Sequence, residues 1–405
     1  MTDERALADE FDLATAGPDF AEDPFPVYRA LLRHAPVKRF ADGSVAVARH
    51  RDLDRIYRDT ATFSSDKTED FAPKFGQSPL YQHHTTSLVF NDAPLHTRVR
   101  RIMVGALTPR AIAAMRPGLE RLVEDLLDGL GPEPDLISDF AAAIPVEVIG
   151  NLFDIPHEDR GPLRDWSLAI LGALEPVLSA DQHDVGNQAV REFSAYLDGL
   201  IASRQAAPGD PDTDVLTRLL RGDRGEHLSA AELVHNCIFI LNAGHETTTN
   251  LIGNALDLFL DHPDQRARLI ADPDLLDSAV EEVLRHQSSN QLGNRITTVA
   301  TEIGGLELAP GTRVHLLMGA ANRDPEVFED PDRFDIARTP NKHVAFAGGP
   351  HICLGLNLAR LEGRIAIGRF LARFPDYVRA GTAVRTGRMR FRGFANLPVR
   401  LTPNR

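Results

Sequence analysis

One stretch of helical periodicity constrains the fold of this chain more than any other feature. Ser229 and Glu232 have the spacing of a capping box, in which each side chain satisfies a free backbone N–H group of the other residue. An apolar run follows them to about Asp261, and Pro263 marks its end because proline cannot continue a helix. At 1.5 Å per residue such a helix is roughly 50 Å long. It is therefore long enough to cross the whole molecule.

The rest of the chain is also mainly helical. Helical periodicity dominates from Pro94 to about Leu260, and a polar, irregular stretch is expected from Asp66 to Thr86. We find no linker, repeat or low-complexity tract that divides the chain. We therefore expect a mainly α fold with minor β structure and a single domain over residues 1–405, of which 1–22 form a poorly ordered tail. Strands are predicted at 37–40 and 44–48, as a hairpin, and within 296–314 and 391–401.

The composition limits the classes of partner. Apolar residues make up 43% and charged residues 25% of the chain, as in ordinary globular proteins. The net charge of −14 argues against nucleic acid, because binding to phosphates depends on Lys and Arg. The acidic N-terminal residues contain no long apolar run, so no membrane anchor is expected. Two cysteines, Cys237 and Cys353, fit a reducing cytoplasm better than a disulfide framework.

Cys353 lies in a glycine-rich run from Phe346 to Gly355 that suits a haem-binding loop. A thiolate is a strong ligand of haem iron. Glycines such as Gly349 and Gly355 allow the backbone to approach a flat cofactor, and backbone amides tune the thiolate by hydrogen bonding. Phe346 is in position to cover the sulfur, and His351 to reach a haem propionate. The alternative is a buried structural cysteine in a glycine-rich loop.

The centre of the long helix has unfavourable helix chemistry. Gly244 costs about 1 kcal/mol relative to alanine in a helix interior, and Thr247 competes for backbone carbonyls. Such local conflicts tend to mark functional sites. Glu246 and Thr247 together form a plausible proton relay, and Ala243 and Gly244 are small enough to leave room for dioxygen. The alternative is a solvated Glu246 beside a threonine that bonds its own backbone.

Five segments in this order resemble the cytochrome P450 family, and the resemblance extends from Asp23 to Leu401. Ala347 stands where the family often has glycine. The segments are Asp92-Ala93-Pro94-Leu95-His96-Thr97-Arg98, Ala243-Gly244-His245-Glu246-Thr247, Glu282-Val283-Leu284-Arg285, Pro331-Asp332-Arg333-Phe334 and the loop from Phe346 to Gly355.

The resemblance implies the fold and the cofactor site of that family. The fold is a helical prism in which haem b lies between the long helix and the cysteine loop, with Cys353 as the iron ligand. Glu246 and Thr247 are the implied catalytic acid and alcohol. Glu282, Arg285 and Arg333 form an implied buried network that supports the loop. The implied cofactor-binding residues are His96, Arg100, Arg295 and His351 at the propionates, and Phe346, Gly349, Gly355 and Ala243 around the ring.

The resemblance also implies a monooxygenase that inserts one oxygen atom from O2 into a small organic substrate, by hydroxylation or O-dealkylation. Only 52 residues follow Cys353, so we expect electrons from NAD(P)H through a separate ferredoxin and ferredoxin reductase. A peroxide-driven peroxygenase and a non-catalytic haem sensor are the alternatives. Basic residues expected on the thiolate side could steer an acidic electron carrier, or could simply be solvated. They are Arg98, Arg101, Arg110, Lys342, Arg360 and Arg364.

A polar segment after Arg285 is the sequence's only indication of substrate chemistry. The family commonly has proline and apolar residues there, whereas this chain has Ser289, Asn290 and Gln291 before Leu292. We expect one of these side chains to hydrogen-bond a phenol, carboxylate or carbonyl of the substrate. The alternative is that they shape a local turn. The pocket is expected to be closed by residues 66–86, 168–178 and 187–200.

Overall fold

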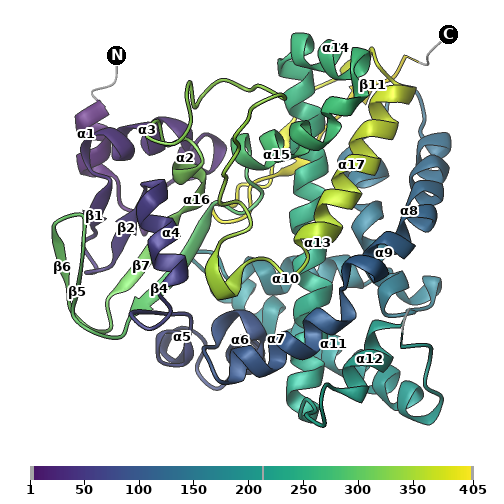
Figure 1. The fold of residues 1–405 in the computed structure, drawn as a ribbon, viewed down its shortest axis with the longest axis horizontal. Coiled ribbons are helices and arrows are strands. Elements are labelled where there is room, and N and C mark those ends of the chain that lie inside the picture. The colour runs from purple at the N-terminus through teal and green to yellow at the C-terminus, as the bar shows by residue number, and fades with distance from the viewer. Residues whose placement is uncertain (1–3, 212–213, 403–405) are drawn as a thin grey trace.

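The computed structural model describes residues 4–211 and 214–402. Its central element is α13 (Ala230–Asp261), which runs through the molecule with α17 (Leu356–Arg373) packed beside it (Figure 1). The predicted capping box is confirmed. The Ser229 N–H donates to Glu232 Oε2 at 2.8 Å, and the Glu232 N–H donates to Ser229 Oγ at 3.2 Å. The long helix predicted from the sequence is thus the axis of the fold.

Helices surround this axis over most of the described chain (Figure 1). No helix of the described residues is both long enough and apolar enough to span a membrane. The remaining helices are α1 (Glu4–Glu10), α2 (Pro18–Glu22), α3 (Phe25–His34), α4 (His50–Arg58), α5 (Thr68–Phe75), α6 (Pro79–Thr86), α7 (Leu95–Ala106), α8 (Pro109–Gly129) and α9 (Ala143–Leu152). They continue with α10 (Leu163–Gly172), α11 (Ala180–Ala206), α12 (Val215–Arg221), α14 (Pro263–Ala271), α15 (Leu276–His286) and α16 (Met318–Ala321).

The β structure is minor, and the larger sheet lies with α1–α4 on one side of the molecule, whereas β11 lies near the C-terminus on the opposite side (Figure 1). A five-stranded sheet has the order β1-β2-β7-β4-β3, in which β2 and β7 are parallel and the other pairs antiparallel. The predicted hairpin is confirmed as β1 paired with β2. The strands are β1 (Val37–Arg39), β2 (Val45–Val47), β3 (Phe63–Ser64), β4 (Leu292–Thr297), β5 (Thr301–Ile303), β6 (Leu306–Leu308), β7 (Arg313–Leu317), β8 (Val378–Arg379), β9 (Val384–Arg385), β10 (Phe394–Asn396) and β11 (Val399–Arg400).

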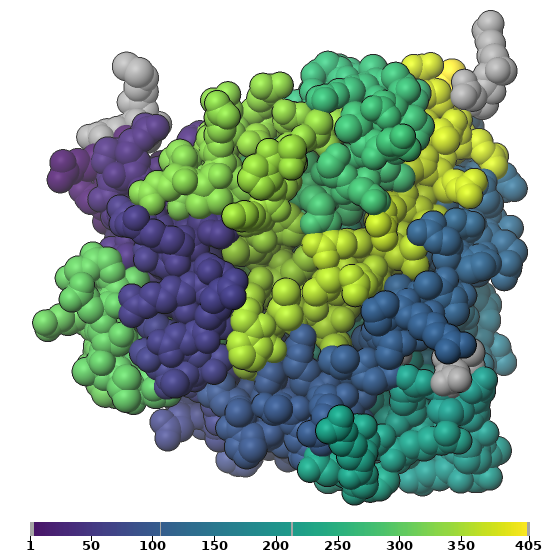
Figure 2. All heavy atoms as spheres, in the orientation of Figure 1, coloured from purple at the N-terminus to yellow at the C-terminus, as the bar shows by residue number. Residues whose placement is uncertain are grey.

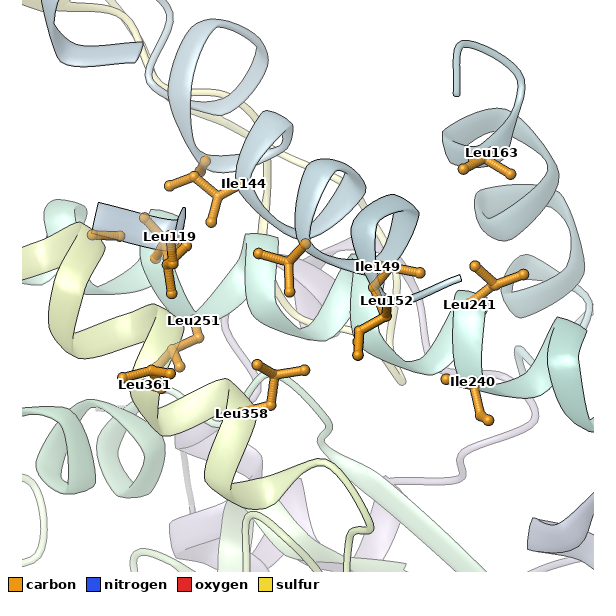
Figure 3. Packing of buried hydrophobic residues seen from close by; sticks show 14 of the residues in the cluster. Leu119, Ile144, Ile149, Leu152, Leu163, Ile240, Leu241, Leu251, Leu358 and Leu361 are labelled. Carbon is orange, nitrogen blue, oxygen red and sulfur yellow. The ribbon is translucent and has the colours of Figure 1, made fainter. Parts of the chain in front are cut away.

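The main hydrophobic core lies where α9 and α17 pack against α13 (Figure 3). Gly244 lets α9 approach closely, because a Cβ atom there would lie 2.4 Å from Ile149 Cδ1. Farther along α13, a Cβ atom on Gly363 of α17 would lie 3.0 Å from Leu251 Cδ2. Burying each such aliphatic side chain contributes about 1.5–3 kcal/mol. These contacts hold the central turn of α13 in place.

Two segments are more regular than the sequence predicts. The tail expected over 1–22 is wrong for residues 4–22, which contain α1 and α2 and are anchored by buried apolar side chains. The Phe11 and Phe20 rings lie 4.9 Å apart, and Ala8 is fully buried. The stretch from Asp66 to Thr86 forms α5 and α6 instead of an irregular loop. Residues 1–3 lie outside the described chain, and the single domain stays a prediction.

Candidate active site

A cavity of about 330 Å³ separates the centre of α13 from the cysteine loop. In Figure 2 the yellow-green surface, whose colour includes the cysteine loop, lies between the purple N-terminal elements and the blue region of α7 and α8. Glu246, Gln291 and Gly349 do not line the cavity. The predicted site residues that do line it are His96, Arg100, Ala243, Thr247, Ser289, Asn290, Leu292, Arg295, Phe346, His351, Cys353 and Gly355.

The cysteine loop is folded tightly around its sulfur. The Cys353 N–H donates to the Phe346 carbonyl at 2.9 Å, and α17 begins three residues later at Leu356. Burial raises the pKa of the Cys353 thiol, whereas a backbone hydrogen bond from Gly355 and the nearby Arg100 and Arg360 lower it. The Gly355 amide and the two arginines thus offset part of the effect of burial on the pKa. Their influence favours the thiolate form that binds a metal ion.

Two backbone positions fix the shape of this loop. Gly349 has φ +61°, and a Cβ atom there would lie 2.1 Å from the Tyr57 carbonyl oxygen of α4. The glycine therefore allows the loop to pack on α4. It was expected to lie beside the cofactor, but it does not line the cavity. Ala347 has φ +56°, a left-handed conformation that costs a non-glycine residue about 1–2 kcal/mol. The alanine that stands where the family often has glycine is thus a strained position.

Four cationic or imidazole groups meet at one side of the cavity. The His96 and His351 ring centroids lie 3.9 Å apart, and Arg100 Nη2 donates to the Ile352 carbonyl at 2.7 Å. His96 Nε2 and Arg295 Nε are buried and have no hydrogen-bond partner within the described chain. Burial, with Arg100 nearby, lowers the pKa of His96 to about 4, and burial with Arg295 nearby lowers that of His351 to about 2. The cluster has donors free for an anionic ligand.

The acid and alcohol of α13 face different surroundings. Thr247 lines the cavity and its Oγ1 donates to the Ala243 carbonyl at 2.7 Å. Glu246 is buried behind it, where Arg388 Nη1 donates to both carboxylate oxygens at 2.7 and 2.8 Å. Burial raises the pKa of Glu246 to about 7, although Arg388 opposes the shift. The alternative of a solvated glutamate is thereby excluded, and Thr247 does bond its own backbone.

The buried network below the loop differs from the predicted one in one member. Glu282 and Arg285 are fully buried and form two hydrogen bonds of 2.8 Å, as predicted. The third cation is Arg338, whose Nε lies 3.2 Å from Glu282 Oε1. The Arg333 side chain is 61% exposed, because the turn at Asp330 directs the Arg333 carbonyl inward to accept from Arg285 Nη2. Arg333 therefore contributes its backbone and not its charge.

Comparisons with known proteins match this geometry. A family model described as Cytochrome P450 matches residues 168–400. Cytochrome P450 107B1 of Saccharopolyspora erythraea is 39% identical over 410 residues, with 96% of this chain and 98% of that protein covered. The 6-deoxyerythronolide B hydroxylase of the same organism is 33% identical, with 96% and 99% covered.

A solved structure agrees at the level of the fold. The crystal structure of P450BioI in complex with hexadec-9Z-enoic acid ligated acyl carrier protein has a TM-score of 0.90 at 34% identity, with 95% of this chain and 100% of that chain covered. The chain belongs to the cytochrome P450 family. Its fold is the predicted P450 fold, and the protein is a P450 monooxygenase, an oxidoreductase with haem b as its cofactor.

The residues of this chain fit haem b. The cavity brings the Cys353 thiol to one wall, small Ala243 and Gly244 to another, and the unpartnered nitrogens of His96 and Arg295 to its side. Two propionates would satisfy these buried donors, which would otherwise be costly to bury. A soft sulfur ligand and anion-binding groups around one enclosed space are what a haem-thiolate site requires.

The polar segment 289–292 of this P450 is only partly directed at the cavity. Ser289 Oγ is buried at the cavity wall and has no hydrogen-bond partner within the described chain. Asn290 Oδ1 accepts from the Leu292 N–H at 3.3 Å, which is the turn-forming alternative. Gln291 does not line the cavity; its amide donates to the Ser288 carbonyl at 2.6 Å, and its side chain lies against Gly319.

The pocket walls and the basic residues also differ from expectation. Ile170, Leu171 and Leu174 line the cavity as predicted, and so do His83 and His84, whereas no residue from 187–200 does.

Of the six basic residues predicted on the thiolate side, Arg110 and Lys342 are exposed and form no ion pair within the described chain. The other four form ion pairs, namely Arg98 with Glu232, Arg101 with Asp223 and Glu226, Arg360 with Glu281 and Arg364 with Asp277.

Sequence reasoning missed two functional arginines and one lysine. Arg388 pairs with Glu246 over 142 positions, and Arg390 lines the cavity. Neither lies in a segment that resembles a motif. Lys67 is fully buried without a hydrogen-bond partner in the described chain. The only sequence signal is the run of alternating arginines at 388, 390 and 392, which is unusual next to a predicted strand.

Proposed function

We propose that this P450 inserts one oxygen atom of O2 into a small organic substrate bound in the cavity, by hydroxylation or O-dealkylation. The observation that carries the proposal is the acid–alcohol pair on α13. Glu246 is buried with a pKa raised to about 7, and the adjacent Thr247 lines the cavity. A carboxyl group with that pKa exists in both protonation states at neutral pH, which is the condition for donating a proton and regaining it.

The cofactor is held, in this proposal, by the groups that surround the cavity. Cys353 is the iron ligand, and His96, Arg100, Arg295 and His351 bind the propionates. Haem with a thiolate ligand supplies the redox centre at which dioxygen is activated. Phe346 is positioned by Arg360, whose guanidinium lies 4.8 Å from the ring centroid. The ring lines the cavity and shields the sulfur from water.

The protein residues control the protons. Arg388 is a positioning residue, because its two hydrogen bonds hold the Glu246 carboxylate and its Nη2 is fixed on the Leu168 carbonyl at 2.9 Å. Glu246 can hold a proton on the residue before Thr247, and Thr247 lines the cavity. Thr247 would need to exchange its bond to the Ala243 carbonyl for one to a cavity ligand. Apolar Leu174 and Phe239 also line the cavity.

Electrons reach the site, in this proposal, from NAD(P)H through a separate ferredoxin and its reductase. Exposed Arg110 and Lys342 offer free positive charge to an acidic carrier. Because Arg98, Arg101, Arg360 and Arg364 are paired with carboxylates, we expect a weaker attraction than six free cations would give. A cytoplasmic location fits this supply and stays a prediction.

Turnover under two electron supplies tests the proposal. The holoenzyme is incubated with a substrate that shifts its spin state, either with NADPH, ferredoxin and reductase or with hydrogen peroxide. We expect product with the reductase system and a loss of that product in Glu246→Gln. Product with peroxide alone, unchanged in Glu246→Gln, would favour the peroxygenase alternative. Absence of product under both supplies, for every substrate that binds, would favour a haem sensor.

A further inference from the structure

One cation of the cavity lies outside the cluster that is assigned to the propionates. Arg390 lies in the connection between β9 and β10 and lines the cavity together with Phe391, Leu174 and Leu292. The other cavity arginines, Arg100 and Arg295, belong to the cluster assigned to the propionates. Among the described residues that line the cavity, Glu362 is the only one with a carboxyl group, and burial raises its pKa to about 8. Glu362 is therefore mostly uncharged at neutral pH and does not neutralise Arg390.

The Arg390 guanidinium is fixed in place with one edge free. Nη1 donates to the Leu292 carbonyl at 2.6 Å and Nε to the Leu174 carbonyl at 3.0 Å. Nη2 has no recorded hydrogen bond, and no carboxylate of the described chain forms an ion pair with Arg390. The Glu175 carboxylate lies at the backbone of this residue, where its oxygens accept the N–H groups of Met389 and Arg390 at 3.0–3.3 Å. Two carbonyls thus orient a charged group toward the cavity.

Lys67 is a second buried cation in this region, although it does not itself line the cavity. It is fully buried and its Nζ has no partner in the described chain. Burial lowers its pKa to about 7, and the charges of Arg295 and Arg390 act in the same direction. A buried lysine without a partner destabilises the folded state, so its presence indicates a functional demand. A need for positive charge near Arg390 would explain why Lys67 is buried there.

The charges around Arg390 do not cancel. The cations that interact in this region are Lys67, Lys74, Arg295, Arg313 and Arg390, and the carboxylates are Asp70 and Glu175. Asp70 is already paired with Arg313 at 2.7 Å, and Lys74 donates to the Ala173 and Glu175 carbonyls. An excess of positive charge therefore remains on a wall of the enclosed cavity, where a low dielectric strengthens its attraction for an anion.

Polar groups beside Arg390 complete the site. The Gln291 N–H donates to the Arg390 carbonyl at 2.8 Å, and the Arg392 N–H donates to the Ser289 carbonyl at 2.8 Å. These bonds place the free Ser289 hydroxyl on the segment next to Arg390. Backbone hydrogen bonds thus connect residues 289–291, which the sequence predicted to bind substrate, to the segment that carries Arg390.

We propose that the substrate of this P450 carries a carboxylate and that Arg390 binds this carboxylate inside the cavity, with Ser289 as a further donor and Lys67 adding positive charge nearby. This inference rests on the proposed function and names its substrate class. A carboxylate suits the free edge of a guanidinium, which a neutral carbonyl would engage far more weakly. The competing explanation is that Arg390 only clamps the Leu174 and Leu292 carbonyls together.

Binding of matched acid and ester pairs to the holoenzyme distinguishes the two explanations. The probes are para-ethylbenzoate and decanoate, each compared with its methyl ester, and the readout is the Kd from the spin-state change of the haem spectrum. We expect at least one acid to bind about tenfold or more tightly than its ester. In Arg390→Gln the preference for that acid disappears while the ester Kd changes little, and Arg390→Lys retains part of it. Arg400→Gln, at an exposed ion pair, is the control.

Three outcomes would overturn the inference. They are the absence of any preference for an acid, an equal weakening of acid and ester in Arg390→Gln, and an unchanged acid Kd in that variant. If Arg390→Gln does not retain haem, Lys67→Met decides, because it leaves the carbonyl clamp intact and is expected to weaken acid binding about threefold. Turnover of neutral esters without an acid preference would overturn this inference and leave the proposed function standing.

Discussion

Two fully buried charged residues, Glu282 and Lys67, have opposite surroundings. Glu282 accepts hydrogen bonds from the side chains of Arg285, Arg338 and Asn341 and from the Asp335 N–H, so both of its oxygens are satisfied. Lys67 is buried to the same degree and has no partner in the described chain. The first arrangement ties α15 to the segment 331–341 that precedes the cysteine loop, whereas Lys67 lies two residues after Ser65, which lines the cavity. We therefore interpret the fully hydrogen-bonded Glu282 as structural. We interpret Lys67, which has no hydrogen-bond partner in the described chain, as a residue that serves ligand binding.

Disrupting the hydrogen-bonded network around Glu282 should have the largest effect on stability and haem content. Glu282→Gln leaves Arg285 and Arg338 buried without their carboxylate, which costs about 3–5 kcal/mol. We expect loss of haem from the purified variant, measured as the ratio of haem to protein absorbance. Arg333→Ala is the matched control, because that side chain is exposed, and it should change the free energy of unfolding by less than about 0.5 kcal/mol. A normal haem content in Glu282→Gln would contradict the account.

The unsaturated region should respond in the opposite direction. A lysine pKa of about 7 in place of 10.5 corresponds to a penalty on the order of 4 kcal/mol at neutral pH. Lys67→Met should therefore raise the free energy of unfolding by about 2–4 kcal/mol at pH 7, as measured by denaturant unfolding.

The pH dependence of stability checks the cause of that effect. Because the folded pKa of Lys67 is the lower one, the unfolded chain binds the additional proton between about pH 7 and pH 10.5, and stability rises with pH across this window. The rise should be reduced in Lys67→Met. Equal pH slopes for the two proteins, or a less stable variant, would show that Lys67 has a partner and that the comparison fails.

Glu246 lies between the two regions in character, because it is paired with Arg388 and still has a raised pKa. Glu246→Gln should lower product formation about 10²-fold without changing substrate Kd, since proton delivery contributes at least that much. Glu133→Gln, at an exposed ion pair, is the control. An unchanged rate in Glu246→Gln would remove Glu246 from the chemistry.

The pH profile sharpens this test. Activity that depends on protonated Glu246 should fall as pH rises through about 7. Arg388 lowers the pKa of Glu246, so Arg388→Gln should move the falling limb to higher pH. A purely structural arginine would change the rate but leave the position of the limb unchanged.

The smallest expected effect concerns backbone strain in the cysteine loop. Ala347→Gly relieves the left-handed conformation at φ +56° but increases the entropy of the unfolded chain. The net stabilisation should be about 0.5–1 kcal/mol, read as a rise in Tm of the holoenzyme. Ala345→Gly, at a neighbouring position without a positive φ, should lower Tm. A lower Tm in Ala347→Gly would show that the alanine methyl contributes packing that outweighs the strain.

Sequence patterns predicted those features that depend on short-range geometry. The capping box at Ser229 and the hairpin around Gly43 require only local spacing, and both are confirmed. The Glu282–Arg285 pair is three residues apart on one helical face and is also confirmed. The helices α5 and α6 were not predicted, because their polar composition gives a weak periodicity and contacts such as the 5.2 Å pair of Phe71 and Phe75 stabilise them.

Features set by long-range contacts could not be predicted. Arg333 and Arg338 lie in one loop, and only the direction of the turn decides which of them reaches Glu282. Arg388 and Arg390 lie between β9 and β10, and their side-chain partners Glu246, Leu174 and Leu292 are distant in the sequence, so no local pattern marks them. The Gln291 side chain turns toward the Ser288 carbonyl, which alternation along a strand does not reveal.

The most direct test of the central claim is the carbon monoxide difference spectrum of the dithionite-reduced protein and of its Cys353→Ser variant. The account predicts the strongly red-shifted Soret band of a thiolate-ligated haem in the wild-type protein and its loss in Cys353→Ser. A band at the histidine-ligated position in wild-type protein, or a red-shifted band that persists in the variant, would contradict the assignment of Cys353 as the iron ligand.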